Sequence, residues 1–197
     1  MPTGVHIRDA RQQLLDAAVR ILLRDGATGL TSRSVTTEAG VAKGVLHKHF
    51  ADFDDFLAEL VRDRLARLGA QTTALRGAAG TGTVTGNLTA ALTELYDPIA
   101  VSVVGLVVFR DTLRERLRTA DPATGIPVLT EAVAMLAAYL TDECELGRIA
   151  ADADVDSLAA ALVGGGHLLF AGGSDDGDTV HDMVDAVLAD VVQRRLL

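Results

Sequence analysis

Hydrophobic residues recur at helical spacing along almost the whole chain. The first helix is predicted over residues 8–25 and ends before Gly26, which suits a helix stop. Its apolar positions share one face: Leu14, Ala18, Ile21 and Leu22. Since no segment shows the strict alternation of a half-buried strand, the pattern predicts an all-α fold.

Two short helices and one long helix are expected next. Thr31 offers a side-chain oxygen as N-cap to a helix that runs to about residue 38, and Gly40 supplies a sharp exit. A third helix is predicted over residues 42–48, and Asp52 caps a fourth that continues to about residue 76. The apolar stripe of this fourth helix is Phe56, Leu57, Leu60, Val61, Leu65 and Leu68.

The glycine-rich run over residues 77–86 interrupts the helical pattern. Its glycines follow a helix, whereas the dinucleotide-binding fingerprint follows a strand, so the run predicts a loop. Further helices are predicted over residues 87–96, 98–119, 124–146, 154–171 and 178–195, with Asp154 and Asp178 as caps of the last two.

The composition is that of a folded protein. Hydrophobic residues make up 49% of the 197 positions, enough for a sizeable core. The single cysteine, Cys144, cannot form an internal disulfide, and the N-terminus lacks the pattern of a secretory signal, which together favour the cytoplasm. The most apolar segment, residues 99–109, is far shorter than the roughly 20 residues of a spanning helix, so no membrane partner is expected.

Charge is distributed unevenly along the chain. Residues 1–50 carry seven basic and four acidic side chains, a balance of +3, while residues 51–197 carry 11 basic and 23 acidic ones, a balance of −12. The only two lysines, Lys43 and Lys48, lie in the basic part. A basic start on an acidic body favours a local contact with a polyanion, although charge alone is equally compatible with a solvated face.

The two short helices have the proportions of a helix-turn-helix, whose second helix enters the major groove of DNA. Both lysines lie on that second helix, where they would neutralise phosphates. Gly44 lies between them and would let the backbone approach a duplex closely.

The stretch TSRSVTTEAGVAKGVLHKHFADFDDFL, residues 31–57, resembles the N-terminal domain of the TetR family of transcriptional repressors. The positions that match are Thr31, Val35, Ala39, Gly40, Val41, Gly44, Leu46, His49, Phe50, Asp52 and Leu57. The resemblance covers about residues 10–60. It implies a helix-turn-helix domain over residues 1–51, which binds an operator in double-stranded DNA, and a helical domain over residues 52–197 for ligand binding and dimerisation. The candidate DNA-binding residues are Thr31, Arg33, Lys43, Gly44, Val45, His47, Lys48 and His49.

Four positions depart from the family pattern. His47 stands where the family has Tyr, Ala42 where it has Ser or Thr, Thr36 where it has Ala and Phe53 where it has Lys. The missing hydroxyl at Ala42 removes a helix N-cap, at a cost of about 1 kcal/mol. A histidine that gains a charge on protonation makes DNA binding sensitive to pH.

Other chemistry is weakly supported. His47 and His49 are two residues apart and point about 200° apart on a helix, so they cannot share a metal ion. No nucleophile motif of the G-x-S-x-G kind occurs, so no catalytic residue, metal or other cofactor is predicted. The alternative left open is a helical small-molecule-binding or enzymatic protein with a degenerate helix-turn-helix.

The resemblance also implies a small apolar ligand, bound between helices of the second domain, that releases the protein from DNA. Large side chains that could shape such a pocket, or equally belong to the core, are Tyr96, Leu106, Phe109, Met135, Tyr139, His167 and Phe170.

A homodimer is expected because one helix-turn-helix reads too few base pairs. Apolar stripes on the last two helices, with the glycines of residues 164–166 allowing close approach, predict the interface. Its candidate residues are Leu162, Gly165, Leu169, Met183, Val184, Val187, Leu188 and Val191.

Overall fold

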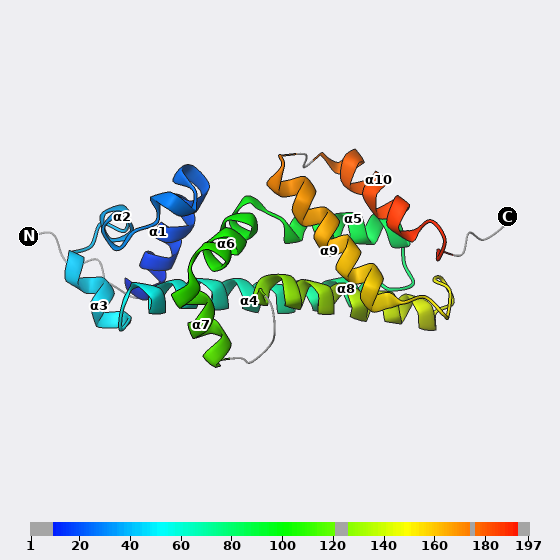
Figure 1. Cartoon of the computed structure of the whole chain (residues 1–197), viewed down its shortest axis with the longest axis horizontal. Coiled ribbons are helices and arrows are strands. Elements are labelled where there is room, and N and C mark those ends of the chain that lie inside the picture. The colour runs from blue at the N-terminus through cyan, green and yellow to red at the C-terminus, as the bar shows by residue number, and fades with distance from the viewer. Residues whose placement is uncertain (1–9, 121–125, 174–175, 193–197) are drawn as a thin grey trace, which may run out of the picture. The chain divides into compact units, whose positions relative to one another are not determined.

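The computed structural model describes residues 10–120, 126–173 and 176–192, and within these ranges the chain is helical with no strand (Figure 1). The all-α prediction is therefore confirmed. The α-helices are α1 (Ala10–Asp25), α2 (Ser32–Glu38), α3 (Leu46–His49), α4 (Phe53–Gly77), α5 (Val84–Leu95), α6 (Pro98–Phe109), α7 (Asp111–Ala120), α8 (Pro127–Glu145), α9 (Val155–Ala171) and α10 (Gly177–Leu188). Two 3-10 helices, η1 (Ala27–Gly29) and η2 (Lys43–Val45), precede α2 and α3.

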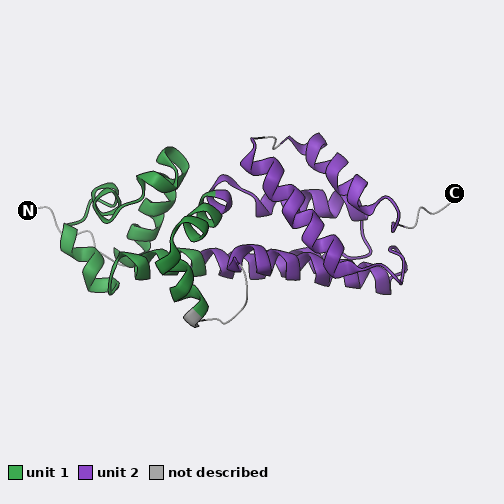
Figure 2. Cartoon of the chain, in the orientation of Figure 1, with its two compact units in different colours: residues 1–62, 102–122 green, residues 63–101, 123–197 purple. Residues whose placement is uncertain are grey.

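The chain forms two compact units (Figure 2). Unit 1 comprises residues 1–62 and 102–122, and unit 2 comprises residues 63–101 and 123–197. Helices α4 and α6 each contribute residues to both units. This division reflects packing, and the predicted functional boundary between residues 51 and 52 stays a prediction.

The core of unit 1 joins α1 to the short helices and to the start of α4. The predicted stripe of α1 is buried, and Leu30, Val35, Leu46 and Phe56 are each fully buried with it. Burying a large apolar side chain contributes roughly 1.5–3 kcal/mol, so these contacts fix the short helices, which are too short to be stable alone.

The two predicted helix stops of unit 1 are confirmed. α1 ends at Asp25 and is followed by Gly26, and α2 is followed after one residue by Gly40. Both glycines have a φ of 68°, a conformation that side-chain-bearing residues adopt only with strain.

Unit 2 packs α8 against α9, and α10 against both α5 and α9. A Cβ atom at Gly166 of α9 would lie 2.7 Å from the ring of Tyr96, so the glycine is needed for the contact. The Tyr96 hydroxyl donates a hydrogen bond to the carbonyl oxygen of Val163. Gly166 thus allows α9 to pack closely against Tyr96 within unit 2.

A buried carboxylate connects α8 to the loop between α4 and α5. Glu143 is fully buried and accepts a 2.6 Å hydrogen bond from the Tyr139 hydroxyl, while its other oxygen lies 3.3 Å from Nε of Arg148. Arg148 and Asn87 in turn donate to carbonyl oxygens of the loop, at Gly82 and Thr81 respectively. The loop is therefore held by polar contacts, because few apolar side chains are present to anchor it.

Several predicted boundaries were wrong. The helix expected over residues 98–119 breaks at Arg110, and a new helix starts at Asp111, whose charge suits a helix N-terminus. The last helix ends at Leu188 within the described residues, and its N-cap is Asp176, which accepts from the backbone of Thr179, in place of Asp178. The predicted loop is shorter than expected because α5 begins at Val84, capped by Thr83.

Candidate nucleic-acid interface

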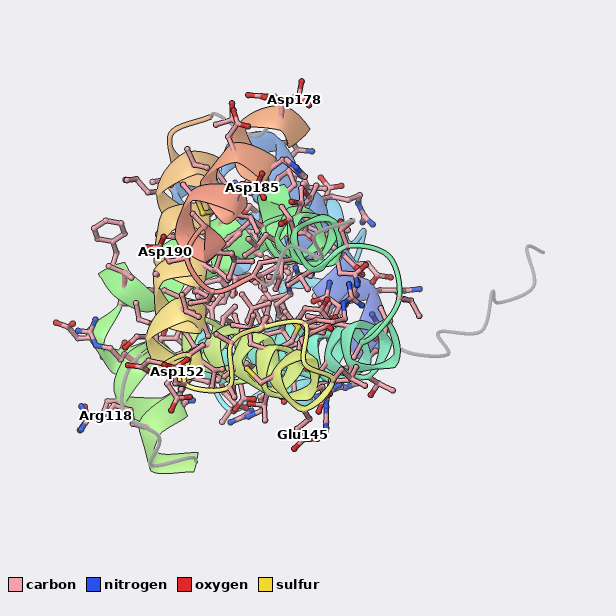
Figure 3. The ribbon with its side chains drawn as sticks, turned by 90° about the vertical axis from the view of Figure 1, so that its right-hand side faces the viewer. Arg118, Glu145, Asp152, Asp178, Asp185 and Asp190 are labelled. Atoms are coloured by element: carbon pink, nitrogen blue, oxygen red, sulfur yellow. The ribbon has the colours of Figure 1, made fainter. Side chains whose placement is uncertain are left out.

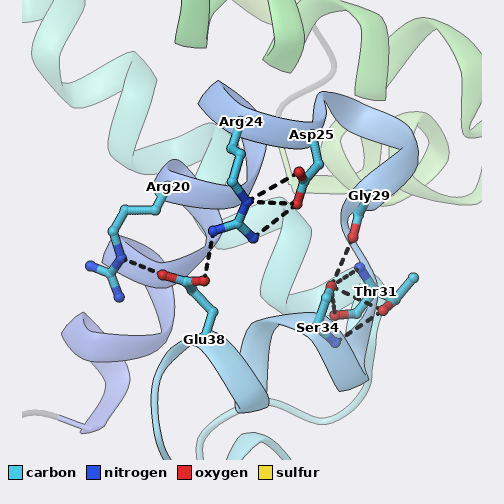
Figure 4. Close-up of polar contacts among 7 residues, drawn as sticks. All are labelled: Arg20, Arg24, Asp25, Gly29, Thr31, Ser34 and Glu38. Atoms are coloured by element: carbon cyan, nitrogen blue, oxygen red, sulfur yellow. Dashed lines mark hydrogen bonds and ion pairs between the residues drawn. The ribbon is translucent and has the colours of Figure 1, made fainter.

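Helix α2 is fixed at its start by a reciprocal cap (Figure 4). The Thr31 hydroxyl accepts a 3.1 Å hydrogen bond from the backbone NH of Ser34, and the Ser34 hydroxyl accepts one of 2.9 Å from the backbone NH of Thr31. Ser34 also donates to the carbonyl oxygen of Gly29 at 2.8 Å. These bonds satisfy NH groups that a helix start leaves open and confirm Thr31 as the N-cap.

The end of α2 is tied to α1 by ion pairs. Figure 4 shows Glu38 between two arginines of α1, with Arg20 Nε at 2.8 Å and Arg24 Nη1 at 3.0 Å. Hydrogen bonds from Arg20, and then from Arg24, lower the pKa of Glu38 below its ordinary value. The same network, led by the bond to Asp25, raises the pKa of Arg24. These two cations are therefore already paired with carboxylates of the protein.

The segment after the turn, η2 with α3, is anchored from below. Leu46 is fully buried, and Phe50 lies edge-on against Phe56 of α4 with ring centroids 5.1 Å apart. The guanidinium of Arg11 lies 5.6 Å from the centroid of the Phe50 ring. Ala42 occupies the N-cap position without any side-chain hydrogen bond, as its lack of a hydroxyl predicts.

The outer face of η2 and α3, residues 43–49, is called the reading segment below. Most of the predicted DNA-binding residues are exposed: Thr31, Arg33, Lys43, Gly44, His47, Lys48 and His49, with Val45 half-buried. The hydroxyl of Thr31 is used for the helix cap, so its predicted contact with DNA depends on the rest of its exposed side chain. The ring of His49 lies 6.5 Å from that of Phe50, centroid to centroid.

Charge pairing separates two groups of cations in unit 1. Arg11 pairs with Glu59, and Arg20 and Arg24 pair with Glu38. In contrast, Arg33, Lys43 and Lys48 make no ion pair with any described residue. These last three, called the unpaired cations, are free to contact an external anion.

Gly44 lies open on the same surface. A Cβ atom built on it would have no protein atom within 4 Å, and its φ is not in the left-handed region. Neither the packing nor the backbone of the chain therefore requires a glycine here, in contrast to Gly26 and Gly40. The close approach of an external partner would explain why a glycine stands at this position.

Among the residues that the structure describes, no group of three or more His, Cys, Asp or Glu side chains is arranged to hold a metal ion. No single helix in the same ranges is long and apolar enough to cross a membrane, and only α5 and α6 taken together, as a bent pair, pass that test.

The side chains predicted to form an apolar pocket are dispersed. Leu106 and Phe109 belong to unit 1 and the other five to unit 2. Phe109, the last residue of α6, is 87% exposed, so its role at a pocket stays a prediction that its exposure does not support. Tyr96, Leu106, Met135 and Tyr139 are buried in the core, whereas His167 and Phe170 are half-buried beside Tyr96.

The predicted dimer residues divide between two faces of α9 and α10. Leu162, Val184 and Leu188 are buried in the core of unit 2, so they lie on the inward stripe of these helices, and their place at an interface stays a prediction. Gly165, Leu169, Met183, Val187 and Val191 are half-buried. The outward face of α9 carries Leu168, which is 76% exposed.

The surface of unit 2 is acidic. Figure 3 labels five carboxylates of this unit that point outward: Glu145, Asp152, Asp178, Asp185 and Asp190. Such a surface repels phosphates, so a contact with nucleic acid is favoured only on unit 1.

Sequence reasoning missed Arg64 of α4, whose side chain is only 6% exposed. It lies three residues after Val61 and four before Leu68, so the spacing of the buried face includes it. The helical spacing could have identified Arg64 as a residue of the buried face, but a stripe chosen by hydrophobicity left it out because it is charged.

Comparison with known proteins agrees with this geometry. Residues 14–60 match the family model of the bacterial regulatory proteins of the tetR family. That range contains α2, the reading segment and the contact of Phe50 with α4.

Curated relatives match in the same region. The chain is 33% identical over 60 residues to the HTH-type nicotine-responsive transcriptional repressor HdnoR of Paenarthrobacter nicotinovorans, which is 30% of this chain and 31% of the relative. It is 38% identical over 69 residues to the HTH-type transcriptional regulator BetI of Burkholderia mallei, 35% of each chain. The matches thus span about a third of these relatives.

Solved structures share the fold over nearly the whole length of the chain. SmeT, the repressor of the Stenotrophomonas maltophilia multidrug efflux pump SmeDEF, superposes with a TM-score of 0.66 over 96% of this chain and 94% of its own, at 17% identity. The likeness extends through both units and concerns the fold.

Proposed function

Since the chain belongs through residues 14–60 to the TetR family of bacterial regulatory proteins, we propose that it is a transcriptional repressor that binds an operator in double-stranded DNA and is released by a small molecule. The protein acts in the cytoplasm, as a non-enzymatic regulator. Residues 1–51 read DNA, and residues 52–197 bind the ligand and form the dimer.

The observation that carries the proposal is the set of unpaired cations. Cations that serve the fold alone are expected to form ion pairs, as Arg20 and Arg24 do with Glu38. Here Lys43 and Gly44 of η2 and Lys48 of α3 are exposed on the reading segment, which the buried side chain of Leu46 anchors to the core. Exposed cations on a rigid helix bind phosphates, and the adjacent side chains can then reach base edges.

A salt series tests this function. Binding of the protein to the DNA upstream of its own gene should weaken steeply as salt rises, with one sequence preferred at every salt concentration. Affinity that shows no sequence preference, or that does not depend on salt, would refute the proposal and favour the alternative of a degenerate helix-turn-helix.

The dimer that operator binding requires is proposed on the outward face of α9 and on α10. Two reading segments must be held at half-sites about 34–36 Å apart, or a multiple of that distance. Leu168 with the half-buried Leu169 and Met183 supply the apolar part of this face, and Gly164 leaves it open to close approach. Its burial in a dimer would remove an exposed leucine from water.

The matched pair Leu168→Arg and Leu146→Arg tests the interface, because Leu146 is also exposed, at 56%, but follows α8. Sedimentation should show a monomer for Leu168→Arg and a dimer for Leu146→Arg. A monomeric parent at micromolar concentration, or two dimeric variants, would contradict the proposed interface.

A further inference from the structure

A polar pocket lies in unit 2 at α4, α5 and the turn that precedes α6. Its volume is about 460 Å³, and its charged and amide side chains are Arg64, Arg67, Gln71, Glu94 and Asp97. The remaining lining consists of Ala70 and Ala74 of α4. None of these residues was among those predicted to bind a ligand. The lining also differs in character from the apolar pocket expected, because most of its side chains are polar.

The base of the pocket is a compensated ion pair. Nη1 of the buried Arg64 lies 2.9 Å from Oδ2 of Asp97, and Nη2 donates to the carbonyl oxygen of Leu95 at 2.9 Å. The other oxygen of Asp97 accepts from the backbone NH of Ala100 at 2.8 Å, in the first turn of α6. Both charges are thus held by the protein itself, and this pair does not leave a net charge for a ligand.

Two polar atoms of the lining side chains lack a partner. Nε of Arg64 and Oε1 of Gln71 are both buried, and neither has a hydrogen bond to any described residue. A buried group left without a partner costs roughly 1–3 kcal/mol, so a bound molecule that pairs with these two atoms would recover this free energy. One is a donor and the other an acceptor, so a molecule that offers both kinds of group would satisfy them.

One carboxylate of the pocket, that of Glu94, has no ion-pair partner among the described residues. Arg67 lies 3.2 Å from Asp63 and is compensated by it. Glu94 is exposed and makes no ion pair or hydrogen bond with any described residue, although it lines the pocket. With Arg64 paired to Asp97, the unpaired charge of the pocket is that of Glu94, and it is negative.

We propose that this pocket binds a small molecule that carries a protonated amine together with a carbonyl or hydroxyl oxygen. Glu94 is the counter-ion of the amine, Gln71 accepts a hydrogen bond from the molecule and Arg64 donates one to its oxygen. The inference rests on the proposed function and names the chemical class of the molecule that controls it. A purely apolar ligand would leave both buried atoms unsatisfied.

Four linear probes of similar length separate the possible charge classes. They are N-acetylcadaverine, a cation with an amide carbonyl; N-pentylacetamide, its neutral analogue; 6-aminohexanoate, a zwitterion; and hexanoate, an anion. Calorimetry of the full-length protein without DNA should show N-acetylcadaverine binding about fivefold more tightly than N-pentylacetamide, since one ion pair at an exposed carboxylate contributes up to roughly 1 kcal/mol. Tighter binding of the neutral, zwitterionic or anionic probe, or no binding by any probe, would overturn the proposal.

A charge-neutralising pair of variants locates the effect. Glu94→Gln should abolish the fivefold preference for the cation over N-pentylacetamide. Glu131→Gln is the control, because Glu131 is an exposed acid of α8 in the same unit and does not line the pocket. A preference that survives in Glu94→Gln, or that is lost equally in both variants, would exclude Glu94 as the counter-ion.

The failure of this inference differs from a failure of the proposed function. Probe binding is measured without DNA, and the salt series is measured without any probe. If salt-dependent, sequence-specific DNA binding holds while the cation is not preferred, only the pocket assignment falls. If the cation is preferred and specific DNA binding is absent, the pocket stands and the repressor proposal falls.

Discussion

Charged side chains are used in opposite ways in the two units. In unit 1, Arg33, Lys43 and Lys48 are exposed and make no ion pair with a described residue. In unit 2, Arg64 and Glu143 are buried, and each has charged and neutral partners. An exposed, solvated charge contributes little to stability and remains available to a partner, whereas a buried charge must be compensated within the fold. An exposed charge without an ion pair is therefore available to a partner, whereas a buried charge contributes to stability only together with its own partners.

The largest effect is expected from breaking the buried set. Glu143→Ala removes the acceptor of the Tyr139 hydroxyl and the partner of Arg148, so it should lower the free energy of unfolding by about 3 kcal/mol. Chemical denaturation measures the change. Glu131→Ala, an exposed acid on the same helix, should change stability by less than about 0.5 kcal/mol. Equal losses in the two variants would contradict the distinction between buried and exposed charges.

The exposed set should show the reverse behaviour. Replacing both Lys43 and Lys48 by Ala should reduce the slope of log affinity against log salt by about 1.8, or 0.9 for each phosphate contact. At 0.15 M salt this corresponds to roughly 30-fold weaker DNA binding at every sequence, with an unchanged melting temperature.

Arg118→Ala is the matched control for the lysine pair, because Arg118 is an exposed cation of α7, outside the reading segment. It should leave the salt slope as it is. A double-lysine variant with the slope of the parent would show that Lys43 and Lys48 do not touch phosphates.

Local features of unit 1 were predictable from sequence because their causes are local. The Thr31 cap, the stops at Gly26 and Gly40 and the buried stripe of α1 each depend on residues within a few positions of one another. The uncapped Ala42 was predictable for the same reason. Helix caps and periodicity carry this information without any knowledge of the tertiary fold.

The pocket of unit 2 was not predictable in this way. Arg64 takes a core position because Asp97 and Leu95, about thirty residues further along the chain, meet its guanidinium. A stripe chosen by hydrophobicity instead included Leu65, which is only half-buried. The exposure of Phe109 was equally hidden from the sequence, since α6 ends at this residue and α7, which follows, makes its contacts with Asp52 and Asp54, about sixty residues earlier in the chain.

Those contacts give a smaller, pH-dependent effect. Arg116 of α7 binds Asp52 through two hydrogen bonds of 2.8 and 2.7 Å, and these lower the pKa of Asp52 below its ordinary value of 3.8. A depressed carboxyl pKa contributes stability above about pH 4, which is lost as the pH falls through the lower, folded-state value. Asp52→Asn can keep the helix cap but removes the charge, so its stability should fall less between pH 5 and 3 than that of the parent.

Denaturation midpoints across that pH range test the contribution of Asp52. Asp16→Asn is the control, because Asp16 is an exposed acid of α1 that accepts a hydrogen bond from Gln12. Asp52→Asn and the parent losing stability in parallel would show that the pair with Arg116 is not what sets the pKa of Asp52.

The smallest effect is expected from His47 of the reading segment, which stands where the TetR family has Tyr and whose charge changes with pH. His47 is exposed on α3, and a histidine side chain carries a positive charge when it is protonated. Protonation adds a charged donor beside phosphate, so DNA affinity should rise by roughly two- to fivefold between pH 8 and pH 6, the range of one exposed ion pair. His47→Tyr should remove this rise, whereas His181→Tyr, an exposed histidine on α10, should retain it. If His47→Tyr shows the same rise as the parent, the pH response arises from another group, and the unpaired charges of the reading segment do not include His47.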